Sequence, residues 1–197
     1  MMDDPRFAHN GFRLDQLIRP VANLYKVSAL APGDEAGAPV AFVRQKKLAI
    51  REDLRFFADE SESDELFRVK ARKVVDVGGR YDVMTPAGEP IGVLQRRLAQ
   101  TLFRTTWTIL DADEQTVAEV PEASTARAVL RRVAQVFDVP ILYHFSIVVE
   151  GRQVGEVRRV LSLRDRYVMT LGDDFDRRID RRLAVALLVV LDALQAR

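Results

Sequence analysis

The strongest constraint on the fold is an apolar segment close to the C-terminus. Residues 183–191 are nine consecutive apolar positions inside a segment that we expect to be helical from Ile179 to Gln195. A helix that is apolar on every side must be surrounded by protein or by lipid. Because a membrane-spanning helix needs roughly 20 such residues, the sequence predicts a helix enclosed by the rest of the chain.

Most of the remaining chain alternates between apolar and polar residues, which is typical of strands. Three segments resemble one another as hairpins: 81–94, 107–120 and 145–157. Each has an alternating apolar arm, a polar turn and a second arm with a small residue, which is Gly92, Ala118 or Gly155. A small residue inside a strand lets another backbone or a bulky side chain approach. Successive hairpins without helical crossovers favour an antiparallel sheet or barrel.

These features predict a mainly β protein, a closed antiparallel barrel of about eleven strands around the C-terminal helix at 179–195. We expect the barrel to occupy residues 21–197. Residues 1–20 are expected to form an N-terminal extension with room for a short helix. A second helix is expected on the surface at 123–137, because its apolar residues have helical spacing and its other face carries arginines.

Composition excludes several classes of function. The chain has no cysteine, so disulfides and thiolate metal sites are excluded, and its two histidines, His9 and His144, lie far apart. We expect no metal and no cofactor. Phosphate-binding glycine loops and the nucleophile elbow are absent, and we expect a non-enzymatic protein. The net charge of +1 argues against a dedicated nucleic-acid binder. The first ten residues lack an apolar core, so we expect a cytoplasmic protein without a transmembrane segment.

Several runs in the chain resemble a known family. They include residues 44–60, residues 68–72, Gly79-Arg-Tyr-Asp-Val83 and Asp165-Arg-Tyr-Val-Met-Thr-Leu-Gly-Asp-Asp-Phe-Asp176, followed by the apolar helix. In their order and spacing they are similar to the LURP-one-related and phospholipid scramblase-like group of the tubby C-terminal-like superfamily. The resemblance covers roughly residues 21–195.

The resemblance implies a barrel of about twelve antiparallel strands threaded by a hydrophobic helix. Relatives are linked with phosphoinositide or acidic phospholipid surfaces, or are named scramblases. Scramblases carry a proline-rich N-terminal region and a palmitoylated cysteine cluster, and this chain has neither. Their calcium segment reads Asp-x-Asp-x-Phe, whereas residues 163–167 keep only Asp165. Calcium-triggered lipid scrambling is therefore not expected here.

A stripe of cations is the candidate binding site. Arg68, Lys70 and Arg72 alternate along one predicted strand and should project from its outer face, with Lys73 extending the patch. Converging cations can hold a phosphate headgroup through charge-assisted hydrogen bonds. The alternative is a solvated outer face whose charge is balanced by neighbouring carboxylates.

Two arginine pairs end the second arms of similar hairpins, Arg96–Arg97 and Arg158–Arg159. Consecutive strand residues point to opposite faces. One arginine of each pair should therefore point into the barrel, unless the strand ends or bulges there. Strand ends at the barrel rim are the alternative reading.

Two classes of function follow from these features. The leading hypothesis is a non-enzymatic module that binds anionic phospholipid, peripherally at the inner membrane surface. The alternative is a protein-interaction or regulatory scaffold that uses the helix at 123–137 and the segment from Phe12 to Leu24 as contact elements. A barrel that binds a small apolar ligand is a third reading, and the enclosed helix argues against it because it should fill the lumen.

Overall fold

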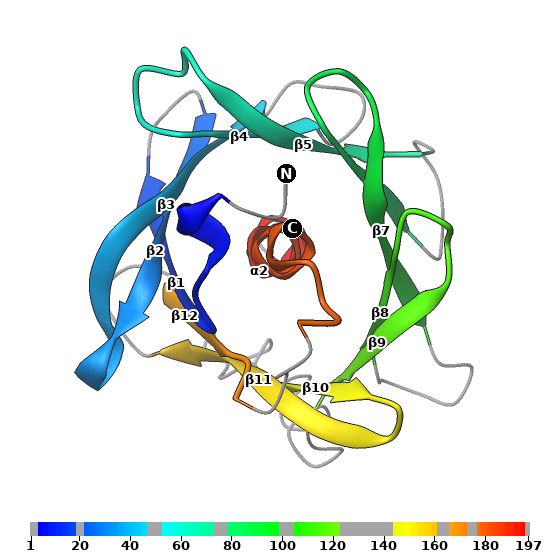
Figure 1. Cartoon of the computed structure of the whole chain (residues 1–197). Helices are drawn as coiled ribbons and strands as arrows, with labels where there is room; N and C mark the ends of the chain where they lie inside the picture. The colour runs from blue at the N-terminus through cyan, green and yellow to red at the C-terminus, as the bar shows by residue number, and fades with distance from the viewer. Residues whose placement is uncertain are drawn as a thin grey trace, which may run out of the picture.

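In the computed structural model the chain forms a closed antiparallel barrel of twelve strands around one helix (Figure 1). The structure describes residues 4–18, 22–46, 53–72, 79–98, 105–122, 144–160, 166–172 and 177–195. Helix α2 (Arg181–Gln195) runs through the middle of the ring of strands. The mainly β fold class and the predicted central helix are both confirmed.

Each strand pairs with its neighbours in sequence, and β1 pairs with β12 to close the barrel. The strands are β1 (Gly11–Ile18), β2 (Ala22–Ala31), β3 (Glu35–Lys46), β4 (Asp53–Phe57), β5 (Glu65–Ala71), β6 (Arg80–Met84), β7 (Pro90–Leu98), β8 (Thr105–Leu110), β9 (Thr116–Pro121), β10 (His144–Val149), β11 (Arg152–Val160) and β12 (Arg166–Thr170). Two short 3-10 helices, η1 (Pro5–Phe7) and η2 (Pro32–Asp34), precede β1 and β3.

The core forms where the inward faces of the strands meet the helix. All nine residues from Leu183 to Leu191 are 1% exposed or less. Alternation in the strands supplies the other half of this core, as in β5, where Phe67 and Val69 are fully buried. The apolar helix therefore occupies the interior of the barrel, which agrees with the expectation from its sequence.

The three similar hairpins share one structural irregularity. In β6–β7 the pair Val83–Gly92 is followed by Met84–Pro90, so that Ile91 has no partner across the ladder. The same register shift follows the pairs Ile109–Ala118 and Ile147–Gly155. A bulge of this kind bends a strand and increases its twist. The likeness between the hairpins therefore reflects one bend repeated around the barrel.

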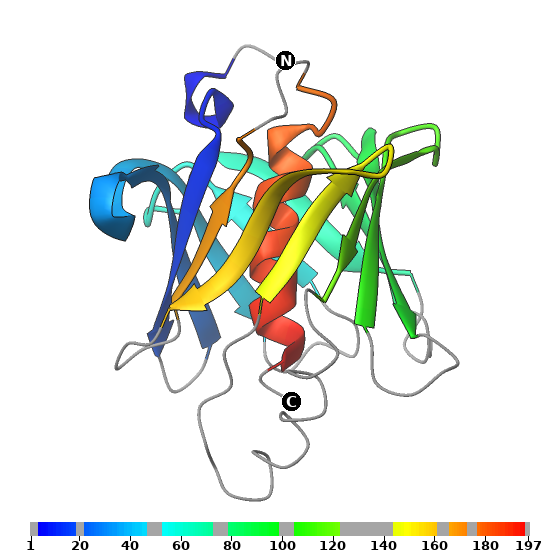
Figure 2. The same ribbon diagram turned by 90° about the horizontal axis from the view of Figure 1, so that it is seen from below.

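The two ends of the barrel differ (Figure 2). One end, here called the turn end, carries the five hairpin turns, the N-terminal segment 4–10 and the start of α2. The other end, here called the linker end, is where α2 finishes and where the described part of each hairpin begins and ends. Each strand thus has one terminus at each end.

The start of the chain differs from the prediction. Residues 11–18, expected in an N-terminal extension, form β1, and Phe12 and Leu14 are fully buried in the core. This strand pairs with both β2 and β12, so residues 11–18 close the barrel and are not an extension of it. The expected surface helix at 123–137 lies outside the described residues. No helix in the described part of the chain is long and apolar enough to cross a membrane.

Candidate functional site

The predicted cation stripe lies on the outer face of β5. Because Phe67 and Val69 point into the core, Arg68, Lys70 and Arg72 project outward, as the alternation predicts. The stripe runs from the middle of the strand toward the linker end. Lys73 lies outside the described residues.

Carboxylates surround the two arginines of the stripe. The Nε atom of Arg68 donates to the Oε1 atom of Glu65 over 2.6 Å. The Nε atom of Arg72 donates to Oδ1 of Asp82 over 2.7 Å, and its Nη2 atom donates to Glu114. These hydrogen bonds, first the one to Glu114 and then the one to Asp82, raise the pKa of Arg72 above its ordinary value. Both arginines are therefore ion-paired on the protein surface.

Lys70 differs from its two neighbours. Its side chain is exposed, and the strand register places it between Asp53 on β4 and Asp82 on β6. Asp82 is engaged by Arg72, and Asp53 lies 3.7 Å from Arg55. Of the stripe residues that the structure describes, Lys70 is the one whose charge is most accessible to a ligand in solution.

Cations and carboxylates are interspersed on the outer face around the stripe. Glu114, in the turn between β8 and β9, pairs with both Arg72 and Arg80, and hydrogen bonds from Arg72 and then Arg80 lower the pKa of Glu114. Around the stripe, the described outer face carries five cations and four carboxylates: Arg55, Arg68, Lys70, Arg72 and Arg80 with Asp53, Glu65, Asp82 and Glu114. This arrangement resembles the balanced outer face that was the alternative reading.

The arginine pairs at the ends of β7 and β11 each divide between the two faces. Arg97 is exposed, and the alternation puts Arg96 on the same inward face as the buried Leu94. On β11, Arg158 lies on the outer face and forms an ion pair with Asp34 over 2.6 Å. Arg159 is opposite Tyr167 in the ladder, and the alternation puts it on the inward face of the strand. The two readings of the sequence are therefore compatible, because each pair lies at the barrel rim and one arginine of each pair is on the inward face of its strand.

A buried arginine fixes the turn end, and the sequence alone did not reveal its role. Arg181 is 4% exposed and donates to the carbonyl oxygens of His9 and Ile179 and to Oδ1 of Asn10, over 3.2, 2.8 and 2.8 Å. Asp180 caps the helix, because its Oδ1 accepts from the backbone N–H of Arg182. These bonds tie the N-terminal segment to the start of α2.

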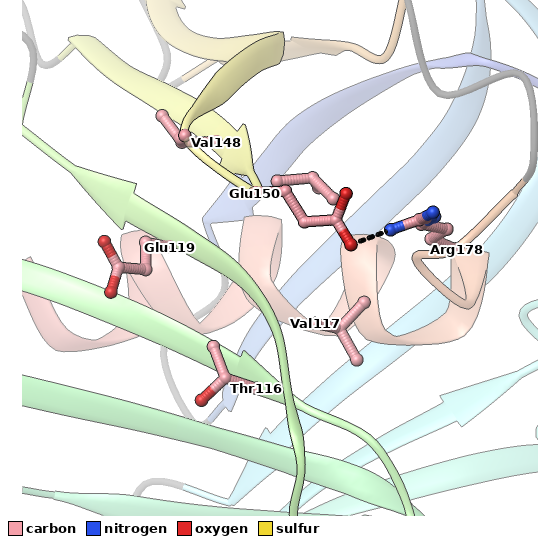
Figure 3. Close-up of a pocket in the computed structure, with 8 residues that line it drawn as sticks. Thr116, Val117, Glu119, Val148, Glu150 and Arg178 are labelled. Atoms are coloured by element: carbon pink, nitrogen blue, oxygen red, sulfur yellow. Dashed lines mark hydrogen bonds and ion pairs between the residues drawn. The ribbon is translucent and has the colours of Figure 1, made fainter.

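A cleft opens between β9 and β10. Among the described residues the ladder between these strands pairs Val148 with Glu119, and an isolated bridge between Glu122 and Phe145 lies nearer the linker end. The cleft has a volume of about 550 Å³ and is lined by residues of both strands together with Arg178. Figure 3 shows the Glu150 carboxylate reaching across to the Arg178 guanidinium, with which it forms an ion pair. The cleft has both apolar and charged walls.

The described residues hold no group of three or more histidine, aspartate or glutamate side chains placed to bind a metal ion. Residues 40–192 match the sequence profile of the LURP-one-related family. The chain belongs to this family. The match runs from β3 into α2, so it includes the β5 stripe and most of the central helix, whereas β1 and β2 precede it. Comparisons with curated proteins and with solved structures found no match.

Proposed function

We propose that this member of the LURP-one-related family is a non-enzymatic module that binds anionic phospholipid at the inner surface of a membrane. The observation that carries the proposal is the outward row of cations on β5, Arg68, Lys70 and Arg72, on a barrel of this family. Lys73 follows directly in sequence and belongs to the proposed site. The tubby-like relatives that the sequence resembles are linked with the same class of ligand.

The ion pairs around the stripe are compatible with this role. Exposed ion pairs contribute only about 0–1 kcal/mol each, because water competes for both partners. A phosphate group offers more acceptor oxygens than a carboxylate and can take two parallel hydrogen bonds from a guanidinium group. A headgroup held first by Lys70 can therefore take over donors of Arg68 and Arg72 from Glu65 and Asp82 at little cost.

The filled interior supports binding on the outside of the barrel. The helix residues of the barrel core are buried against inward side chains of the strands, and Leu187 and Leu188 at their centre are fully buried. A small apolar ligand would have to displace them. The third reading of the sequence, a barrel with an apolar ligand in its lumen, is therefore disfavoured.

Sedimentation with vesicles of graded phosphatidylserine or phosphoinositide content tests the proposal, at low and physiological salt and with and without calcium. We expect binding that rises with anionic lipid, falls with salt and does not depend on calcium. The triple variant Arg68→Gln, Lys70→Gln and Arg72→Gln should bind about tenfold or more weakly, given roughly 1 kcal/mol for each cation near a charged membrane. A matched control neutralises Lys26, Arg152 and Arg178. Equal binding by the two triple variants and the wild type would refute the stripe as the site.

The alternative is a protein-interaction scaffold, and the cleft between β9 and β10 is the observation that favours it. Of the contact elements expected from sequence, Phe12 and Leu14 are buried within β1 and cannot contact a partner. The helix at 123–137 lies outside the described residues. If no vesicle binds the protein, a partner that remains bound at high salt and is released by Val148→Arg in the cleft would establish this second function.

A further inference from the structure

The barrel has opposite charges at its two ends. The described residues of the turn end are residues 4–10, the five hairpin turns, the two residues of each strand next to them and residues 177–182, and they carry fourteen carboxylates and six arginines. The carboxylates belong to Asp4, Asp34, Glu35, Asp59, Glu60, Glu62, Asp64, Glu65, Glu89, Asp111, Asp113, Glu114, Glu150 and Asp180, and the arginines are Arg6, Arg152, Arg177, Arg178, Arg181 and Arg182. A net charge of +1 for the whole chain therefore conceals a strongly acidic end.

The linker end has the opposite sign. Among the last two residues of each strand at this end, with Arg72 and Glu122 that follow β5 and β9, those whose side chains are described include six cations and two carboxylates. The cations are Lys70, Arg72, Arg80, Arg97, Arg159 and Arg166, and the carboxylates are Asp53 and Glu122. Arg72 and Arg80 pair with Glu114 of the β8–β9 turn, and Arg166 pairs with Asp15, so Lys70 and Arg97 contribute most to the field outside this end. Glu122 is 6% exposed, so it contributes little to the field outside the barrel.

The central helix matches this distribution. Its N-terminus, with a partial positive charge, lies within the acidic turn end, and its C-terminus, with a partial negative charge, lies at the basic linker end. Four arginines, at positions 177, 178, 181 and 182, lie beside the helix N-terminus, but the carboxylates of the turn end outnumber them. The separation of charge is therefore compatible with a stable barrel and needs no external partner to maintain it.

We infer that the barrel docks end-on, with its linker end against the anionic phospholipid surface and its turn end pointing away. The inference rests on the proposed function and specifies the orientation of the bound protein. Docking by the turn end would place fourteen carboxylates and six arginines against anionic lipid, and this excess of negative charge would be repelled. The β5 stripe fits the same orientation, because Lys70 and Arg72 lie at the linker end of their strand.

Two exposed arginines at opposite ends test the orientation. Arg97 lies near the end of β7 at the linker end, and Arg152 begins β11 at the turn end. Neither position belongs to the β5 stripe. With phosphatidylserine vesicles at low salt, Arg97→Glu should weaken binding about tenfold, and Arg152→Glu should leave it within about twofold. Circular dichroism and thermal unfolding of both variants verify that each remains folded.

A second measurement reports orientation without altering charge. Because the chain has no cysteine, Ala87→Cys in the β6–β7 turn and Thr105→Cys at the start of β8 each give one labelling position. Energy transfer from each label to an acceptor lipid should be higher from position 105 than from position 87. Higher transfer from position 87, or equal weakening by the two charge reversals, would overturn the orientation while leaving lipid binding intact. Absence of wild-type binding would instead refute the proposed function, and the orientation with it.

Discussion

Gly92 and Gly155 lie where a side chain has no space. A Cβ atom at Gly92 would lie 2.3 Å from the carbonyl oxygen of Leu110, and one at Gly155 would lie 2.1 Å from that of Thr170. We expect Gly92→Ala and Gly155→Ala to reduce stability by about 1–3 kcal/mol each, because the neighbouring strand has to shift. For a chain of this size the melting temperature should fall by roughly 2–4 °C per kcal/mol.

Gly172→Ala is the matched control for these variants, because nothing lies within 4 Å of a Cβ atom built there. Thermal unfolding monitored by circular dichroism compares the three variants with the wild type. If all three melt together with the wild type, the close approach at the hairpin bulges is wrong.

Asp15 is a residue whose charge stabilises the barrel seam. It accepts two hydrogen bonds from Arg13, over 2.6 and 2.8 Å, and one from Arg166 on β12 over 3.0 Å. Burial alone would raise the pKa of Asp15, but the hydrogen bonds from Arg13 and Arg166 outweigh burial and hold the pKa below its ordinary value. The ionised carboxylate therefore favours the folded state.

The pH dependence of stability follows from this direction. A lowered pKa in the folded state gives stabilisation above the unfolded-state pKa, about 3.9 for aspartate, which is lost as the pH falls through the folded-state value. We expect the urea midpoint of the wild type to fall as the pH drops below about 4. Asp15→Asn should have a lower midpoint at pH 7 and a shallower decline in acid. Parallel profiles for the two proteins would contradict the role of this carboxylate.

At the residue scale the sequence predicted which way side chains point, and it did not predict their partners. The outward direction of Arg68, Lys70 and Arg72 follows from alternation within one strand. Their carboxylate partners do not, because Glu114 is 42 positions from Arg72 and is brought close only by the barrel. Arg181 is a similar case, since its acceptors on residues 9 and 10 lie more than 170 positions away.

Among the elements, β1 is the one whose role depends most on distant contacts. It pairs with β2, the next strand in the sequence, and with β12, the last strand in the sequence, where Phe12 lies opposite Met169. We expect deletion of residues 1–18 to abolish cooperative unfolding, because both β2 and β12 would lose a partner and the core would be exposed. Deletion of residues 1–3 should be tolerated and is the control.

The contrast between β1 and α2 shows what a sequence can reveal about an element. The helix is predictable because its apolar character is local and leaves one physical solution, enclosure by the strands. In this strand the inward residues Phe12 and Leu14 alternate with Arg13 and Asp15, and such charged residues are typical of a solvated segment. In the structure Arg13 is 7% exposed and donates to the carbonyl oxygen of Asp34, in the turn before β3. That turn is a tertiary contact that alternation does not reveal.

For the whole molecule, the separation of charge predicts weak association between copies. With a net charge of +1, the repulsion between two copies is small, so attraction between an acidic turn end and a basic linker end decides the sign of their interaction. We expect the second virial coefficient, measured by light scattering, to become negative at about 0.01 M salt, where the Debye length is about 30 Å.

The coefficient should return toward zero at about 0.15 M salt, where the Debye length is about 8 Å. Arg97→Glu, which removes charge from the basic end, should weaken the attraction at low salt. A coefficient that becomes more positive on lowering the salt would indicate that the charges are mixed evenly over the surface, and it would also remove the electrostatic basis for end-on docking.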